Sequence, residues 1–194
     1  MSEQALSYVC FDLETTGLDP MTGQILEIGA FQVENGVTVS KYHSMAKPDL
    51  PIPYSITEIN GITNEEVADA PSEAEVLSEF YEWCGDYPFL GHNVFGFDYR
   101  YLKTRGKHYG LDFSNGGTRM GWDTLKIARK ELPYIANHKL MTVRDHFGIK
   151  LDGKAHRADY DAIITKLIFD RFVSLGLVKE AVNIEAEISK PKFG

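Results

Sequence analysis

The chain has 194 residues, 43% of them hydrophobic and 25% charged, with a net charge of −8. These values predict one globular domain and exclude a disordered chain. The sequence contains no apolar run of about 20 residues and no basic-then-apolar leader, so we expect neither a membrane span nor a signal peptide. Its two cysteines are too few for a disulfide framework or a cysteine zinc site, so we expect buried thiols in a cytoplasmic protein.

The first half of the chain predicts three strands that open a sheet. Residues 7–11 form an apolar run that ends at Asp12, and a loop rich in Gly, Thr, Asp and Pro follows. Residues 25–33 and 37–42 are β-prone and flank an Asn-Gly pair at residues 35–36. An Asn-Gly pair between two such runs is the strongest local signal of a hairpin.

Helices alternate with strands in the rest of the chain. Ser72 and Glu75 have the spacing of a capping box, which predicts a helix that ends near residue 83. A short strand is expected at residues 88–91, a loop at residues 107–118, and a fifth strand between the helices predicted at residues 98–106 and 124–132. The remaining predicted helices span residues 98–106, 124–132, 140–147, 157–175 and 178–187.

Together these elements predict an α/β fold with a mixed five-stranded sheet flanked by helices. We expect a single domain over residues 1–194. Its core would cover about residues 8–175, and a C-terminal helix and tail would cover residues 176–194.

The net charge hides a division along the chain. Residues 1–98 contain two basic and 17 acidic residues, whereas residues 99–194 contain 18 basic and 11 acidic ones. This division is typical of a fold whose basic region meets an anionic partner, and it is equally compatible with charges scattered over a solvated surface.

Asp12 and Glu14 stand two residues apart at the end of the first predicted strand, so their side chains share a face. Two carboxylates on one face repel each other unless a cation neutralises them, and hard oxygen ligands favour Mg²⁺ or Mn²⁺. Taken alone, the pair is equally compatible with a solvated loop start. Asp98 alone is compatible with an acid that is favoured at a helix N-terminus.

Two acids compete for a role in the long helix predicted near the C-terminus. Asp161 lies in one row with Ile164 and Ile168, so it faces the core, where a carboxylate needs a partner. Asp159 lies on a more exposed row, and we interpret it as a first-turn acid. His156 precedes Asp161 by five residues, which places it off that face, so it must reach the site from the start of the helix or from the loop before it.

Three motifs in this order resemble those of the DEDDh (DnaQ-like) 3′→5′ exonucleases: FDLETTGLDP with ILEIGAF, GHNVFGFDYRYL, and HRADYDA. The similarity covers about residues 8–172. It is greatest to the proofreading epsilon subunit of DNA polymerase III and the exonuclease domain of C-family polymerases. It implies an RNase H-like fold and the release of nucleoside monophosphates from single-stranded or frayed DNA 3′ ends. It also implies a site for two ions, Mg²⁺ or Mn²⁺, and a DNA polymerase as one possible docking partner.

The resemblance also assigns roles to matching positions. The metal-binding acids would be Asp12, Glu14, Asp98 and Asp161, with His156 as the general base. Thr15, Thr16, Gly17 and Leu18 would lie against the terminal nucleotide, and Asn93 would also bind substrate. Two features depart from the family pattern: the second motif is one residue longer between His92 and Asp98, and Asn60 stands where many relatives have histidine.

A basic stretch with interleaved aromatic residues follows the second motif, and it contains no acid between residues 99 and 111. Cations can hold phosphates and aromatic rings can stack on bases, so we expect Arg100 in this stretch to bind substrate. The alternative is an amphipathic helix that buries Tyr99 and Leu102.

Three other functions compete with a DNA exonuclease. An RNA 3′-end trimming exonuclease would share the chemistry, although TTGL after Glu14 is more like the proofreading group than the oligoribonucleases. An aspartate-nucleophile phosphatase is loosely suggested by DLETT, but this leaves the H-x-x-x-x-D element unexplained. A non-catalytic binding module is disfavoured because all five catalytic positions are filled.

Overall fold

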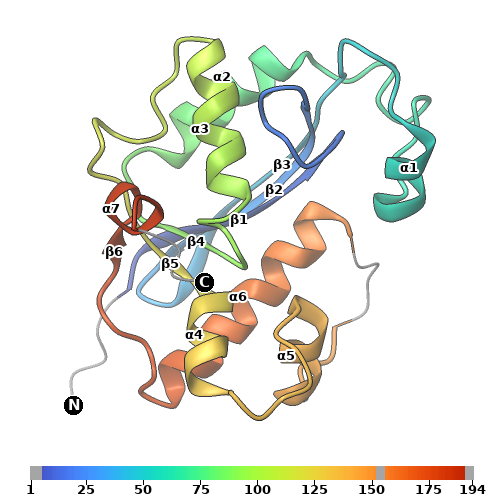
Figure 1. The fold of residues 1–194 in the computed structure, drawn as a ribbon. Coiled ribbons are helices and arrows are strands. Elements are labelled where there is room, and N and C mark those ends of the chain that lie inside the picture. The colour runs from blue at the N-terminus through green and yellow to red at the C-terminus, as the bar shows by residue number, and fades with distance from the viewer. Residues whose placement is uncertain (1–5, 152–155, 191–194) are drawn as a thin grey trace.

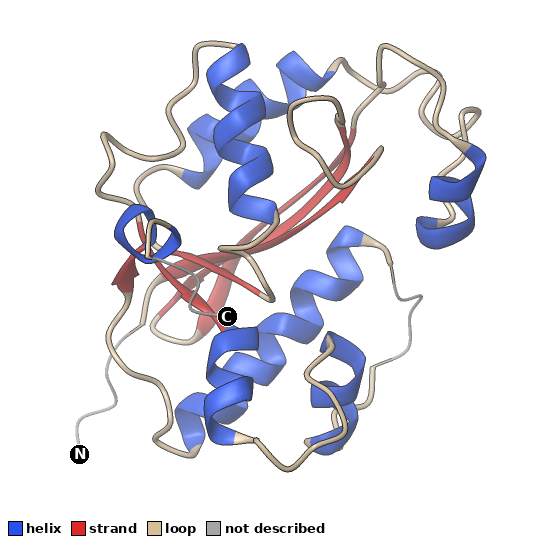
Figure 2. Cartoon of the chain, in the orientation of Figure 1, coloured by secondary structure: helices blue, strands red, loops and turns tan. Residues whose placement is uncertain are grey.

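The computed structural model describes residues 6–151 and 156–190, and it shows one sheet with helices on both faces (Figures 1 and 2). The strands are β1 (Tyr8–Thr15), β2 (Ile25–Glu34), β3 (Val37–Met45), β4 (Phe89–Gly91), β5 (Met120–Asp123) and β6 (Val182–Asn183). The helices are α1 (Tyr54–Asn60), α2 (Glu73–Cys84), α3 (Asp98–His108), α4 (Thr124–Glu131), α5 (Leu140–His146), α6 (Ala158–Ser174) and α7 (Ile184–Ile188).

The sheet is mixed, as predicted, with the strand order β3-β2-β1-β4-β5-β6. Strand β1 pairs antiparallel with β2 and parallel with β4. The predicted count of five strands is one too few, and the helix expected at residues 178–187 begins only at Ile184. The reason is that Asn183 caps α7 by accepting a hydrogen bond from the backbone N–H of Ala186 (2.8 Å), while the residues just before α7 pair with β5 as β6.

Two local predictions are confirmed at the level of backbone geometry. Asn35 and Gly36 join β2 to β3 with φ angles of 52° and 80°, the left-handed conformation that this hairpin turn requires. At the start of α2, the Ser72 side chain accepts a hydrogen bond from the backbone N–H of Glu75, and the Glu75 carboxylate accepts one from the backbone N–H of Ser72. In contrast, the sequence predicts no helix at α1.

The hydrophobic core lies on both faces of β1, which is the element that places the site. Phe11 and Phe89 pack with Phe80 of α2 on one face, and Phe169 of α6 packs against Tyr8 on the other. The carboxyl end of β1 therefore lies between two helical layers, next to the first turns of α3 and α6. Both cysteines are buried free thiols, as expected.

Among the helices of residues 6–151 and 156–190, none combines the length and apolar character that crossing a membrane requires.

Candidate active site

Four acids predicted from the sequence meet at the carboxyl end of β1. Asp12 and Glu14 are half-buried on this strand, and Asp98 and Asp161 lie buried in the first turns of α3 and α6. The backbone N–H of Leu13 donates to Asp98 Oδ1 at 3.1 Å, which ties the start of α3 directly to β1. The strand and the two helix starts thus direct acids from distant parts of the chain into one site.

Burial and mutual repulsion raise the pKa of every carboxyl group in this cluster. The pKa of Glu14 is raised to about 8 and that of Asp98 to about 7, mainly because burial penalises the charged form. The pKa values of Asp12 and Asp161 are raised for the same reason, and neighbouring carboxylates raise that of Asp12 further. In addition, Asp161 Oδ1 is buried and has no hydrogen-bond partner among the residues that the structure describes. A group of buried carboxylate oxygens that lack neutralising positive charge fits a hard divalent cation.

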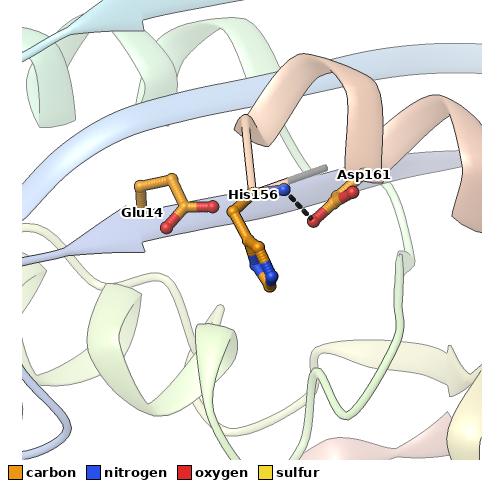
Figure 3. A group of neighbouring side chains, drawn as sticks. All are labelled: Glu14, His156 and Asp161. Carbon is orange, nitrogen blue, oxygen red and sulfur yellow. Dashed lines mark hydrogen bonds between the residues drawn. The ribbon is translucent and has the colours of Figure 1, made fainter. Parts of the chain in front are cut away.

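His156 reaches the cluster from just before α6, as the five-residue offset predicts. Its backbone N–H donates to Asp161 Oδ2 at 3.2 Å, and its φ of 61° is in the left-handed region. Figure 3 shows His156 between Glu14 and Asp161, and ligand atoms of these three side chains lie within 4.8 Å of one another. The imidazole is exposed, so solvent or substrate can reach it.

The helix register separates the two competing acids as expected. Asp161 is buried at 7% exposure, whereas Asp159 is exposed and accepts a hydrogen bond from the backbone N–H of Tyr160.

The loop that follows β1 is fastened at its base and open at its tip. The carbonyl of Gly17 accepts hydrogen bonds from Thr15 Oγ1 (2.7 Å) and from the Tyr101 hydroxyl (2.6 Å), and Thr16 bonds to Gln24 across the loop. Leu18 projects from this frame with 86% of its surface exposed. It borders a hollow of about 240 Å³ that Arg100 also lines.

The segment between His92 and Asp98 forms a tight turn. Asn93 has a φ of 66°, and its carbonyl accepts hydrogen bonds from the backbone N–H groups of Gly96 and Phe97. The turn leads directly into α3, whose first residue is Asp98. The His92 ring bonds to Thr124 Oγ1 and to the His138 carbonyl, both at 2.9 Å, and its burial lowers its pKa to about 4. His92 is therefore a structural residue, while Asn93 is exposed.

The basic stretch after Asp98 forms the amphipathic helix that was the alternative interpretation. Tyr99 and Tyr101 are fully buried, so they cannot stack on bases, and the stacking interpretation is wrong for both. Lys103 and Arg105 form ion pairs with Glu185 (2.5 Å) and Glu73 (2.6 Å). Arg100 is exposed, and within the described part of the chain it forms no ion pair.

The sequence reasoning missed three residues around the site. Glu27 lies directly opposite Glu14 in the β1–β2 pair and is fully buried, where it bonds to Arg157. A lone acid inside the apolar segment ILEIGAF was the signal that could have identified it. The buried Asn60 side chain partly offsets the rise of the Glu14 pKa.

The mixed sheet, the helical layers on both faces and the acid cluster at the end of β1 define a nuclease of RNase H-like fold. The chain belongs to the RNase_T exonuclease family, whose model matches residues 9–169. The predicted family and enzyme class, a DnaQ-like exonuclease, are therefore confirmed.

Larger DNA polymerases contain a region that is similar in sequence to this chain. The chain is 36% identical over 159 residues to the PolC-type DNA polymerase III of Bacillus cereus, covering 82% of this chain and 11% of that protein. It is 37% identical over 187 residues to the PolC-type enzyme of Thermotoga maritima, covering 96% and 13%. The chain thus spans only about a tenth of the length of these relatives.

Solved structures share the fold. Exonuclease X, in complex with 5′ overhanging duplex DNA, matches with a TM-score of 0.72 and 26% identity, covering 95% of this chain and 99% of that one. The zinc-bound exonuclease I–ssDNA complex of E. coli matches with a TM-score of 0.78 and 19% identity, covering 89% and 41%, which supports the fold alone.

Proposed function

We propose that this protein is a 3′→5′ exonuclease that releases nucleoside monophosphates from single-stranded or frayed DNA ends. The observation that carries the proposal is the convergence of four acids and His156 at the end of β1, in a chain of an exonuclease family. We further propose that residues 1–194 act as one exonuclease domain, with the core at about 8–175.

The acid cluster would hold two Mg²⁺ or Mn²⁺ ions. Asp12 would hold the ions together with Asp98, Glu14 and Asp161, since its charge interacts with those of all three other acids. Glu14 and Asp161 would provide the carboxylate ligands nearest His156. When bound, two such metal ions lower the pKa of an attacking water and neutralise the leaving 3′-oxygen.

His156 would act as the general base. Its backbone is anchored to Asp161, and the exposed ring lies beside the acids, so it can take a proton from the attacking water. Because four carboxylates already provide hard oxygen ligands, an imidazole adds little as a metal ligand here.

The loop after β1 would receive the 3′-terminal nucleotide. Thr15, Thr16 and Gly17 form its fixed base, and the exposed Leu18 offers an apolar contact for a base. Arg100, which lines the same hollow as Leu18, would contact a phosphate. Asn93 would add a polar contact from the turn before α3.

DNA is favoured over RNA because the relatives are DNA polymerases and the exonuclease X complex contains duplex DNA with an overhang. The PolC-type relatives also support a DNA polymerase as the partner of this domain. The two free buried thiols support a cytoplasmic location.

The test compares three end-labelled substrates: single-stranded DNA, duplex DNA with a mismatched 3′ end, and RNA. Mononucleotide release from both DNA substrates, requiring Mg²⁺ or Mn²⁺ and stopped by a chelator, is the expected result. If RNA were degraded faster than both DNA substrates, RNA would be the substrate instead of DNA. Degradation of a closed single-stranded circle would contradict exonuclease action.

A further inference from the structure

Helix α6 begins without a capping side chain of its own. Its N-cap residue is Arg157, which makes no side-chain capping hydrogen bond. Instead, Glu27 Oε2 accepts a hydrogen bond from the backbone N–H of Ala158 at 3.1 Å. The same carboxylate accepts hydrogen bonds from Arg157 Nε (3.1 and 3.2 Å) and Nη2 (2.9 Å). One buried acid of β2 thus holds both the backbone and the side chain at the start of α6.

The backbone of α6 packs directly against the backbone of β2 at Gly29. A Cβ at Gly29 would lie 2.2 Å from the backbone nitrogen of Asp159, so glycine permits the helix to rest directly on the strand. We call the bonds of Glu27 to Arg157 and Ala158 the clamp. Two further groups enclose it: His43 Nε2 lies 2.7 Å from Glu27 Oε1, and Arg157 Nη1 lies 3.2 Å from Glu66 Oε1. The clamp fixes the helix start in both position and orientation.

The clamp connects strands β1 and β2 to His156 and Asp161 at the start of α6. Glu27 lies directly opposite Glu14 in the β1–β2 register. On the other side, His156 immediately precedes Arg157, and the backbone N–H of Asp161 donates to the Arg157 carbonyl at 2.9 Å. A shift of Arg157 would therefore move His156 and Asp161 together relative to Glu14.

We propose that Glu27 and Arg157 are positioning residues of the active site. They hold the start of α6, and with it His156 and Asp161, in the place that divalent metal binding and water activation require. This inference rests on the exonuclease function proposed above. The competing explanation is that the pair only stabilises the fold, and the experiment must separate the two.

Arg157→Met removes the bidentate pairing and leaves most of the side-chain volume. Loss of an outer partner that orients ligands costs about 10–100-fold in metal affinity or activity. We expect a fall of this size in kcat and in Mn²⁺ affinity measured by calorimetric titration, with KM for a single-stranded oligonucleotide nearly unchanged. Arg157→Lys should lie between wild type and Arg157→Met, because one ammonium group cannot pair in the fixed fork of a guanidinium.

A double variant separates positioning from stability. Arg157→Met leaves the buried Glu27 charge without its main partner and should lower Tm. Adding Glu27→Gln removes that charge and should recover part of the Tm, while kcat and Mn²⁺ affinity stay low. Lys166→Met is the matched control: it removes another cation from α6, one that pairs with Asp170 at 2.6 Å away from the helix start, and should leave both values at wild-type level.

The inference would be overturned if kcat and Mn²⁺ affinity recovered together with Tm in the double variant. It would also be overturned if Arg157→Met kept the kcat and the Mn²⁺ affinity of the wild type. A wild-type protein that binds Mn²⁺ but degrades no nucleic acid would instead overturn the proposed function. In that case the Mn²⁺ titrations of the variants would still test the clamp.

Discussion

Glu14 and Glu27 face each other across the same pair of strands, yet their pKa values move in opposite directions. The pKa of Glu14 is raised to about 8, whereas that of Glu27 is lowered to about 2. Glu14 is half-buried and Glu27 is fully buried, yet it is Glu27 whose pKa is lowered, so burial alone does not explain the difference. Glu27 is surrounded by donors from His43, Arg157 and the backbone of Ala158, while Glu14 faces other carboxylates.

The difference teaches how this fold separates a structural acid from a catalytic one. Glu27 has its compensating charge built into the protein, so its free energy of burial is offset when the chain folds. The acids at the end of β1 have little such compensation, so they attract a cation from solution. The following predictions test this contrast, from the largest expected effect to the smallest.

Removal of an acid from the uncompensated group should abolish activity. Asp12→Ala should leave no measurable nucleotide release, because it removes a carboxylate that would hold the catalytic metal ions. Asp161→Asn should be nearly as severe, and Asp159→Asn, on the exposed side of the same turn, should be mild. Shortening of a 5′-labelled oligonucleotide and Tm, measured on the same preparations, check this. A crippled Asp159→Asn beside an active Asp161→Asn would contradict the assignment.

Loss of the general base should reduce turnover without removing the metal site. His156→Ala should lower kcat by about 10²–10⁴-fold. Mn²⁺ binding should survive because the four carboxylates remain. Calorimetric titration and single-turnover kinetics measure the two effects separately. A stable variant with near-normal kcat would leave His156 without a role in proton transfer.

The two kinds of acid should give opposite pH dependences of stability. Without metal, the raised pKa of Glu14 means that folding binds a proton, so stability is full below about pH 4.5 and is lost as pH rises towards about 8. The lowered pKa of Glu27 means that its contribution is present above about pH 4.5 and is lost as pH falls towards about 2.

Unfolding scans with and without Mg²⁺ measure this behaviour. The metal-free protein should lose Tm between about pH 5 and pH 8, and saturating Mg²⁺ should remove most of that loss because bound metal favours the charged acids. A metal-free protein whose Tm is constant over this range would show that the cluster is compensated within the chain.

The smallest effect is expected from the exposed arginine of α3. Arg100→Ala should weaken binding of single-stranded DNA and reduce the salt dependence of log K by about 0.7, the loss of one phosphate contact. Arg105→Ala is the matched comparison, since Arg105 already pairs with the buried Glu73; it should lower Tm and leave the salt dependence unchanged. Salt titrations of fluorescence anisotropy distinguish the two, and identical slopes for both variants would leave Arg100 without a phosphate contact.

The sequence by itself determined the features that depend on residues close together in the chain. The Asn-Gly hairpin and the capping box of α2 need only a few adjacent residues, and the placement of Asp161 inside and Asp159 outside follows from helical periodicity. The order of the acidic motifs was also visible, and it led to the right family.

Only the tertiary structure decided which charges have partners. Glu27 and Arg157 are 130 residues apart, and Lys103 and Glu185 are 82 apart, so no local pattern pairs them. Burial of Tyr99 and Tyr101 depends on how α3 packs against the sheet, and the extended residues of β6 depend on pairing with β5. Whether a carboxylate is structural or waits for a metal depends on these long-range contacts, because they determine how much positive charge surrounds it when it is buried.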